Sequence, residues 1–252
     1  MNKTCYKILA IGVALIAFGG FRASGQTGKP EWIIRAGYSI GGTAPLGVPA
    51  TIRSIDAFRL TPSVMTGVDV DIPLGKPWGI LTGLRFQNKA MDTDVTTKGY
   101  RMEVVKGDSK IEGLFTGHVR QEVSQWMLTL PVCATLKAGR SLTLKAGPYL
   151  SLLLDKDFSG IASDGYLRQG DPTGPRLNMG SVEGEWATYE FSDEMRPLQV
   201  GATVGLDWHL LRHFGLSADL DWGLTGIFKS DFKTVEQKLF PIYGTIGVFY
   251  DF

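Results

Sequence analysis

A strict two-residue alternation over residues 198–210, LQVGATVGLDWHL, is the feature that most constrains the fold of this chain. All seven even positions are apolar and no odd position is. Successive side chains of a β-strand point to opposite faces, so the pattern predicts a strand with one apolar face. The segment is also longer than the ~5–6 residues of an average globular strand. Its apolar face therefore meets either a soluble core or membrane lipid.

The same alternation recurs in seven further segments, which gives eight predicted strands. Three connections between them are short and four are long. Short turns at one end and long loops at the other are typical of outer-membrane barrels, whose periplasmic turns are short. The predicted fold is an all-β, eight-stranded antiparallel up-and-down transmembrane β-barrel. The further strands are 32–40, 64–72, 78–86, 126–136, 142–152, 214–224 and 240–252, with short turns at 73–77, 138–141 and 211–213 and long loops at 41–62, 88–125, 155–197 and 227–238.

The first residues read as a cleavable export signal. Lys3 and Lys7 precede an apolar and glycine run over residues 8–21, and small residues follow at 23–25. This pattern predicts cleavage between Gly25 and Gln26 and a barrel domain over residues 26–252. The alternative, a membrane-anchoring helix, needs about 20 apolar residues, and this run is shorter.

Cysteine positions limit the other options for an exported chain. Cys5 lies before the apolar run, whereas a lipoprotein needs a cysteine directly after it. After cleavage Cys133 is the only thiol, which excludes a disulfide within the chain and a cysteine-based metal site. The net charge of +1 argues against a nucleic-acid binder, which would show a basic excess.

Two of the long connections have a readable composition. Residues 100–105 and 111–115 indicate that the third and fourth strands continue beyond the membrane as a hairpin. The connection 155–197 is rich in Gly, Asp, Ser and Pro, which is a mobile polar composition, but composition alone does not decide whether this loop is ordered.

Aromatic residues on the outward face support the membrane interpretation. They fall near the two ends of the predicted strands, as expected for rings that settle at the two membrane interfaces. A soluble β-sandwich would alternate but would not sort its aromatics into two belts. The predicted belts contain Trp32, Trp78, Trp208, Phe214, Tyr250 and Phe252 near the short turns, and Phe86, Trp126, Trp222 and Phe240 near the long loops.

Charged residues mark the inward face. Eight strands enclose a space that side chains can just fill, and buried charges must pair. Five bases and five acids predict a salt-bridged, filled lumen, with a gated ion path, small pore or transporter as the alternative. The predicted network is Arg35, Asp69, Asp71, Arg85, Lys89, Lys137, Lys145, Asp207, Asp219 and Asp221.

An enzyme acting on lipids or peptides would need a catalytic set at the barrel rim. Only His118 lies near the long-loop end, with Asp108, Ser109 and Ser124 close in sequence; His209 and His213 lie near a short turn. We therefore expect no enzymatic activity. The sequence contains no phosphate-binding loop, dinucleotide fingerprint or paired histidines, and Asp155, Asp157 and Asp164 lack calcium-loop spacing, so we expect no cofactor or metal.

The stretch from Leu128 to Asp155 resembles the PorT-type outer-membrane β-barrel family, through residues 128–131 (LTLP) and 146–149 (AGPY). The final YGTIGVFYDF resembles the C-terminal strand that the barrel-assembly machinery recognises, with Phe252 last and Tyr250 two residues before it. The resemblance implies an eight-stranded outer-membrane barrel and no single activity. Some members of the family assist protein secretion and gliding machinery.

Together these observations predict an integral protein of the bacterial outer membrane. Its expected partners are outer-membrane lipid, the assembly machinery during insertion and a protein partner at the extracellular loops. We expect a structural or interaction role, accessory to a secretion or surface complex. The alternatives are a small pore or transporter and a lipid- or peptide-modifying enzyme at the rim.

Overall fold

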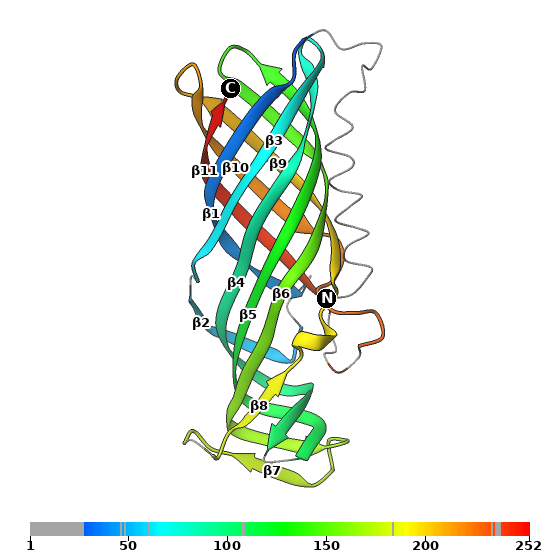
Figure 1. Ribbon diagram of the computed structural model, residues 1–252. Helices are drawn as coiled ribbons and strands as arrows, with labels where there is room; N and C mark the ends of the chain where they lie inside the picture. Colours follow the sequence, from blue (N-terminus) through cyan, green and yellow to red (C-terminus); the bar gives the residue numbers. More distant parts are fainter. Residues whose placement is uncertain are drawn as a thin grey trace.

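The computed structural model describes residues 28–45, 47, 49–59, 61–106, 109–182, 184–232, 234 and 238–252 (Figure 1). The predicted export signal and its cleavage site lie outside these residues. No helix in the described ranges is long and apolar enough to cross a membrane.

Eight long antiparallel strands close into a ring, which confirms the predicted barrel. Each strand pairs with its neighbours, and the first pairs with the last through thirteen residue pairs, from Ile33↔Asp251 to Pro45↔Leu239. The described strands of the ring, in order, are β1 (Glu31–Pro45), β3 (Ser63–Gly75), β4 (Trp78–Lys106), β5 (Ser109–Ala138), β6 (Leu142–Gln169), β9 (Leu198–His209), β10 (Phe214–Gly223) and β11 (Leu239–Asp251).

Three strands are much longer than a membrane crossing requires. β4, β5 and β6 contain 29, 30 and 28 residues and project beyond the other strands, so that one side of the barrel carries a long extension (Figure 1). The predicted hairpin at the end of the third and fourth strands is confirmed, because β4 and β5 remain paired as far as Lys106↔Ser109. We call the part of the protein built on these projecting strands the extension.

The third long connection, whose order its composition does not decide, forms regular structure. Residues 155–197 contain the second half of β6, the strands β7 (Arg176–Met179) and β8 (Ala187–Glu190), and a short 3-10 helix η1 (Ser192–Glu194). Although the segment is polar on average, it contains a few apolar residues, among them Phe158 and Leu167, which are fully buried. The first long connection also forms a strand, β2 (Ile52–Arg59), which pairs with β4.

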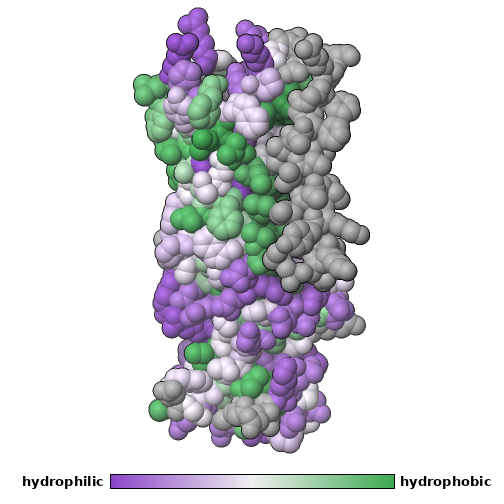
Figure 2. Space-filling model, in the orientation of Figure 1, coloured by the Kyte–Doolittle hydropathy of each residue, from purple (hydrophilic) through white to green (hydrophobic). Residues whose placement is uncertain are grey.

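The outer surface of the barrel is apolar where it meets lipid. Figure 2 shows a hydrophobic band on the half of the molecule that holds the short turns, and a hydrophilic band beyond it toward the extension. Of the predicted belt residues, Trp126 is half-buried and stacks on Phe86 with ring centres 5.0 Å apart. Phe240 is also half-buried. The exposed belt residues are Trp32, Trp78, Phe86, Trp208, Phe214, Trp222, Tyr250 and Phe252.

The C-terminal residue takes part in closing the ring. The backbone N–H of Phe252 donates to the carbonyl of Trp32 at 3.0 Å, and the rings of Tyr250 and Phe252 meet edge to face at 5.0 Å. The last strand is therefore held at its very end, beside the start of the first strand.

Candidate functional site

Six charged side chains inside the barrel form a closed ring of ion pairs. They point inward because each occupies the inward phase of its strand, and all are buried. The ring runs Arg35, Asp207, Lys145, Asp219, Arg85, Asp69 and back to Arg35. Cations and anions alternate around it, so every carboxylate lies between two cations. We call these six residues the lumen ring.

Two arginine side chains, Arg35 and Arg85, each donate hydrogen bonds to two carboxylates of the lumen ring. The two terminal nitrogens of Arg35 donate to the two carboxylate oxygens of Asp207 at 2.8 and 2.6 Å, and its Nε donates to Asp69. Arg85 donates to Asp69 at 2.8 Å and to Asp219 at 3.2 Å. A planar guanidinium can bind two carboxylates with well-directed hydrogen bonds, which fits it for this position better than an ammonium group.

Several of these pairs cross the lumen from wall to wall. Arg85 lies on β4 and Asp219 on β10, and these strands stand opposite each other in the ring of eight. Lys89 and Asp221 on the same two strands form a second crossing pair at 3.1 Å, nearer to the extension. The rings of Tyr149 and Tyr243 lie 5.1 and 5.5 Å from the Lys89 ammonium. The charged side chains therefore fill the cross-section at two successive levels.

Besides Lys89 and Asp221, two further predicted members of the network lie outside the lumen ring. Asp71 is buried and accepts a hydrogen bond from Thr135 at 3.0 Å. Lys137 pairs with Asp71 at 3.9 Å and with Glu31 at 3.1 Å, and its side chain is about 43% exposed. Lys137 is the penultimate residue of β5 and Glu31 begins β1, so both lie at the open mouth beside the short turns. Sequence analysis missed Glu31.

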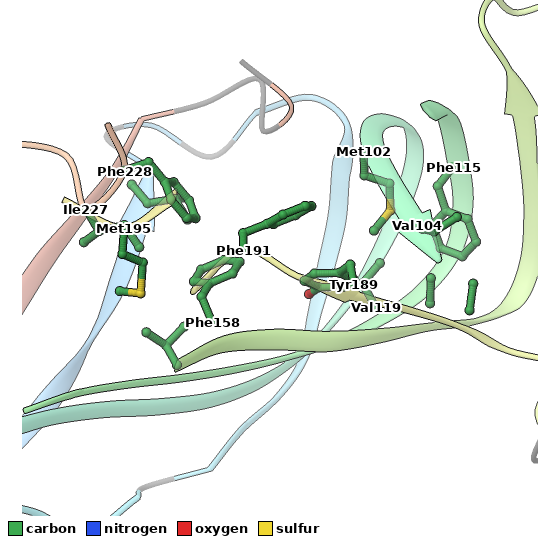
Figure 3. Packing of buried hydrophobic residues seen from close by; sticks show 14 of the residues in the cluster. Met102, Val104, Phe115, Val119, Phe158, Tyr189, Phe191, Met195, Ile227 and Phe228 are labelled. Atoms are coloured by element: carbon green, nitrogen blue, oxygen red, sulfur yellow. The ribbon is translucent and has the colours of Figure 1, made fainter. Parts of the chain in front are cut away.

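A second closure lies beyond the ring, within the extension. Buried apolar residues from β4–β8 and β11, and from the connections on either side of η1 and between β10 and β11, form one cluster, part of which is shown in Figure 3. Its centre is aromatic: the rings of Phe158 and Phe228 meet edge to face at 4.8 Å, and those of Tyr189 and Phe191 stack at 5.5 Å. Burial raises the pKa of Tyr189, so its hydroxyl remains protonated. We call this set the apolar cluster.

The sequence contains a signal for the apolar cluster in the residues that face inward along β4. Along β4 the inward residues change from Arg85 and Lys89 to Met91 and Val95, while the outward residues become Asp92 and Asp94. Odd-numbered residues face inward from Arg85 to Val95, but they change from charged to mainly apolar, and the outward residues become charged. Such a reversal marks the point where a strand leaves lipid and enters water.

Ion pairs cover the outer face of the extension at this level. Arg59 of β2 pairs with Asp94 at 2.6 Å and with Asp92 at 3.2 Å, and Arg120 of β5 pairs with Asp92 at 3.0 Å. The Asp94 carboxylate raises the pKa of Arg59 above its ordinary value. These contacts fasten β2 to the outer face of β4 and β5.

The histidines form no catalytic set among the described contacts. His118 lies on the outer face of β5, 3.1 Å from the Thr96 hydroxyl and 3.6 Å from the Asp56 carboxylate, where it helps to hold β2. Ser124 is six residues along the same strand, about 20 Å away at ~3.3 Å per residue. His209 and His213 both contact Asp251 at the short-turn end. In the described part of the chain no three His, Cys, Asp or Glu side chains gather as a metal site.

A closed ring of eight antiparallel strands, with charged residues inside and an apolar outer surface, defines an outer-membrane β-barrel protein. Residues 23–229 match the family described as outer membrane protein beta-barrel domain, and the chain belongs to this family. No curated protein matches the sequence.

Solved structures of outer-membrane proteins are similar to the chain at low sequence identity. CarO2 of Acinetobacter baumannii has 12% identity and a TM-score of 0.41, over 87% of this chain and 98% of that one. Ail, the attachment invasion locus protein of Yersinia pestis, has 10% identity and a TM-score of 0.40, over 89% and 100%. OprG of Pseudomonas aeruginosa has 13% identity and a TM-score of 0.39, over 88% and 95%.

Proposed function

We propose that this protein is a non-conducting membrane anchor that presents the extension, on the extracellular side of the membrane, as a folded binding surface to a protein partner. The observation that carries the proposal is the double closure of the interior. The lumen ring and the Lys89–Asp221 pair cross the barrel within the membrane, and the apolar cluster packs between the strands and connections of the extension beyond them. A chain built for passage would leave a continuous polar path between these levels.

The extension supports the interaction role. Its three long strands, the short strands and the apolar cluster give it a core of its own, so its surface is held in one arrangement. A rigid surface binds a partner without the entropy cost of ordering loops. The charged outer face formed by Arg59, Asp92, Asp94 and Arg120 suits a polar protein contact rather than lipid.

Conductance in planar bilayers tests the closed lumen. We expect the purified protein to insert without stable single-channel steps. The positive control removes both closures: it combines Arg85→Ala, Asp219→Ala, Lys89→Ala and Asp221→Ala with replacement of residues 92–122 and 156–194 by short turns. Stable steps from the unmodified protein would overturn the proposal and favour a small pore or transporter.

Co-purification from native membranes tests the interaction role. A tagged full-length protein is cross-linked in cells, and a matched variant carries Arg59→Ala and Arg120→Ala on the outer face of the extension. We expect a protein partner that the variant retains less well at equal expression. Equal recovery with the barrel alone, after replacement of residues 92–122 and 156–194 by short turns, would count against the extension as the binding surface.

Further parts of the proposal rest on the sequence. Residues 128–131 and 146–149 support a PorT-type barrel and an accessory role in a secretion or surface complex. Residues 1–25 support export with cleavage after Gly25, and the terminal Phe252 supports recognition by the barrel-assembly machinery. Outer-membrane lipid is the medium that the apolar band requires. We propose no enzymatic activity for the rim, since His118 contacts Thr96 and Asp56 in holding β2.

A further inference from the structure

A cavity of about 230 Å³ lies inside the extension, between β2, the end of β1 and the inward face of β4. Met91, Val95 and Met102 form its wall on β4, and Phe158 and Phe191 of the apolar cluster form its floor. Among the described residues that line it, none is charged; the polar ones are threonines, tyrosines and one glutamine. Its volume exceeds the ~150 Å³ of an engineered apolar cavity that remains dry and takes up benzene.

The cavity opens at a seam in the wall of the extension. Pairing of β1 with β3 ends at Ser39↔Ser63, so β1 continues from Ile40 with its second edge unpaired. β2 pairs with β4 on one side only. The two unpaired edges therefore border the same space, and residues from both of them line the cavity.

Two irregularities in β2 give the seam an apolar lining. Register shifts between Ile52 and Ser54 and between Ile55 and Ala57 place Ile52, Ile55 and Phe58 opposite the inward residues Thr97, Val95 and Thr93 of β4. Without these bulges, residues three apart would alternate between the faces. The entrance is formed by Ile55 and Phe58, which are 61% and 45% exposed although they line the cavity.

Gly42 of β1 makes room for the entrance. A Cβ at this position would come within 3.1 Å of the Phe58 ring and 3.0 Å of the Met91 sulfur. The missing side chain lets β1 approach β2 closely while the space behind them stays open. On the barrel side of the entrance, the side chains of Tyr38, Ile40 and Val64 are exposed on the outer surface. The lipid-facing surface therefore continues as far as the entrance.

We propose that this cavity binds a single hydrocarbon chain, which enters through the seam at the outer headgroup level of the membrane. The seam must lie outside the hydrocarbon region of the membrane, because unpaired backbone groups at strand edges are not tolerated there. The chemistry follows from the lining, whose described residues offer no charge to an ionic group. The volume lies below the ~300–1,000 Å³ of typical small-molecule pockets, which suits part of one chain rather than a ring system. This inference is independent of the closed lumen and of the protein partner.

Photo-crosslinking of the full-length protein in lipid nanodiscs tests the proposal. One arm uses a free fatty acid with a diazirine in its chain, and the other uses a phosphatidylethanolamine that carries the same chain. We expect labelled peptides from residues 52–58 and 91–102, in addition to lipid-facing strand residues. Labelling by the free acid alone identifies a soluble amphiphile, and labelling by both identifies membrane lipid as a source; either result supports the proposal.

Val95→Trp fills the cavity and should lower labelling of these two segments about tenfold, with the lipid-facing residues as internal reference. Lys98→Trp, an exposed position on the same strand, is the matched control and should not change it. Ile55→Asp places a charge at the entrance without disturbing the core, and Val182→Asp is its exposed control. Labels confined to lipid-facing residues, or labels that persist in both Val95→Trp and Ile55→Asp, would overturn the proposal. A conducting protein with normal labelling would overturn only the proposed function.

Discussion

The lumen of the barrel and the interior of the extension are built on the same strands and have opposite chemistry. On β5 the inward residues are Gln125 and Thr129 within the barrel but Val119 and Val123 in the extension, and the outward residues change from Val132 to Glu122. Alternation alone therefore says which residues share a face and not which face is apolar. The surrounding medium decides that: lipid requires an apolar outside, and water permits the ordinary apolar core.

The two interiors also resist change in different ways. A buried charge that loses its partner remains in a medium that solvates it poorly, whereas a lost apolar side chain leaves a cavity. The lumen ring shares each charge between two partners, so one substitution affects two others. We expect the apolar cluster, which lies beyond the lipid-facing band, to open without unfolding the barrel.

The largest expected effect comes from breaking the lumen ring. Asp69→Ala leaves Arg35 and Arg85 each without one carboxylate, and should lower the free energy of unfolding by about 3–5 kcal/mol. Urea unfolding in lipid vesicles, followed by tryptophan fluorescence, measures it. Lys137→Ala, at the exposed mouth, is the control and should lie within ~1 kcal/mol of the parent. Equal losses for the two variants would show that the ring is no stronger than a surface pair.

Removing the centre of the apolar cluster should act locally. Phe158→Ala deletes a fully buried ring that contacts Phe228 and should destabilise the extension by roughly 3–5 kcal/mol. Limited proteolysis should cut the variant within residues 156–194, while heat-modifiable migration of the barrel on a gel is retained. Loss of heat-modifiable migration would mean that the two interiors fold as one unit.

One pair of substitutions on the outward face of β5 tests the reversal directly. Val132→Arg places a charge on the lipid-facing surface and should cost about 2–4 kcal/mol in vesicles. Glu122→Val, on the same face but in the extension, should change the free energy of unfolding by less than ~1 kcal/mol. If both substitutions have similar costs, the membrane boundary does not fall between these two residues.

The smallest expected effect is a pH dependence at β2. Hydrogen bonds from Ser54 and Thr96, with a smaller contribution from His118, lower the pKa of Asp56 below its ordinary 3.8. A carboxyl with a lowered folded pKa stabilises the folded state above 3.8, and this stabilisation is lost as pH falls through the folded value. Amide exchange in Ile52–Arg59, corrected for intrinsic rates, should therefore remain slow at about pH 5 and accelerate only below pH ~4. Asp56→Ala should exchange faster at both values, and no difference between the two proteins would contradict this role.

Much of the barrel could be predicted because its signals are local. The alternation at 198–210 and in the seven related segments specified the strands, and the inward phase selected Arg35, Asp69 and Asp207 as lumen residues. The exposure of Lys137 could not be predicted, because the inward phase of a strand does not say how deep a residue lies, and the last residues of a strand reach the open mouth. The order of residues 155–197 could not be predicted either, because a few buried apolar residues outweigh a polar average composition.

By itself, the sequence determined the strand pattern, the inward charges and the apolar outer band, since each follows from the two-residue period of an extended chain. Only the tertiary structure decided which charges meet across the lumen, because that depends on how eight strands are staggered when the ring closes. It also decided the cavity: bulges turn Ile52, Ile55 and Phe58 to one side, and β1 and β2 leave their edges unpaired. These are relations between distant segments, and the local sequence pattern does not contain them.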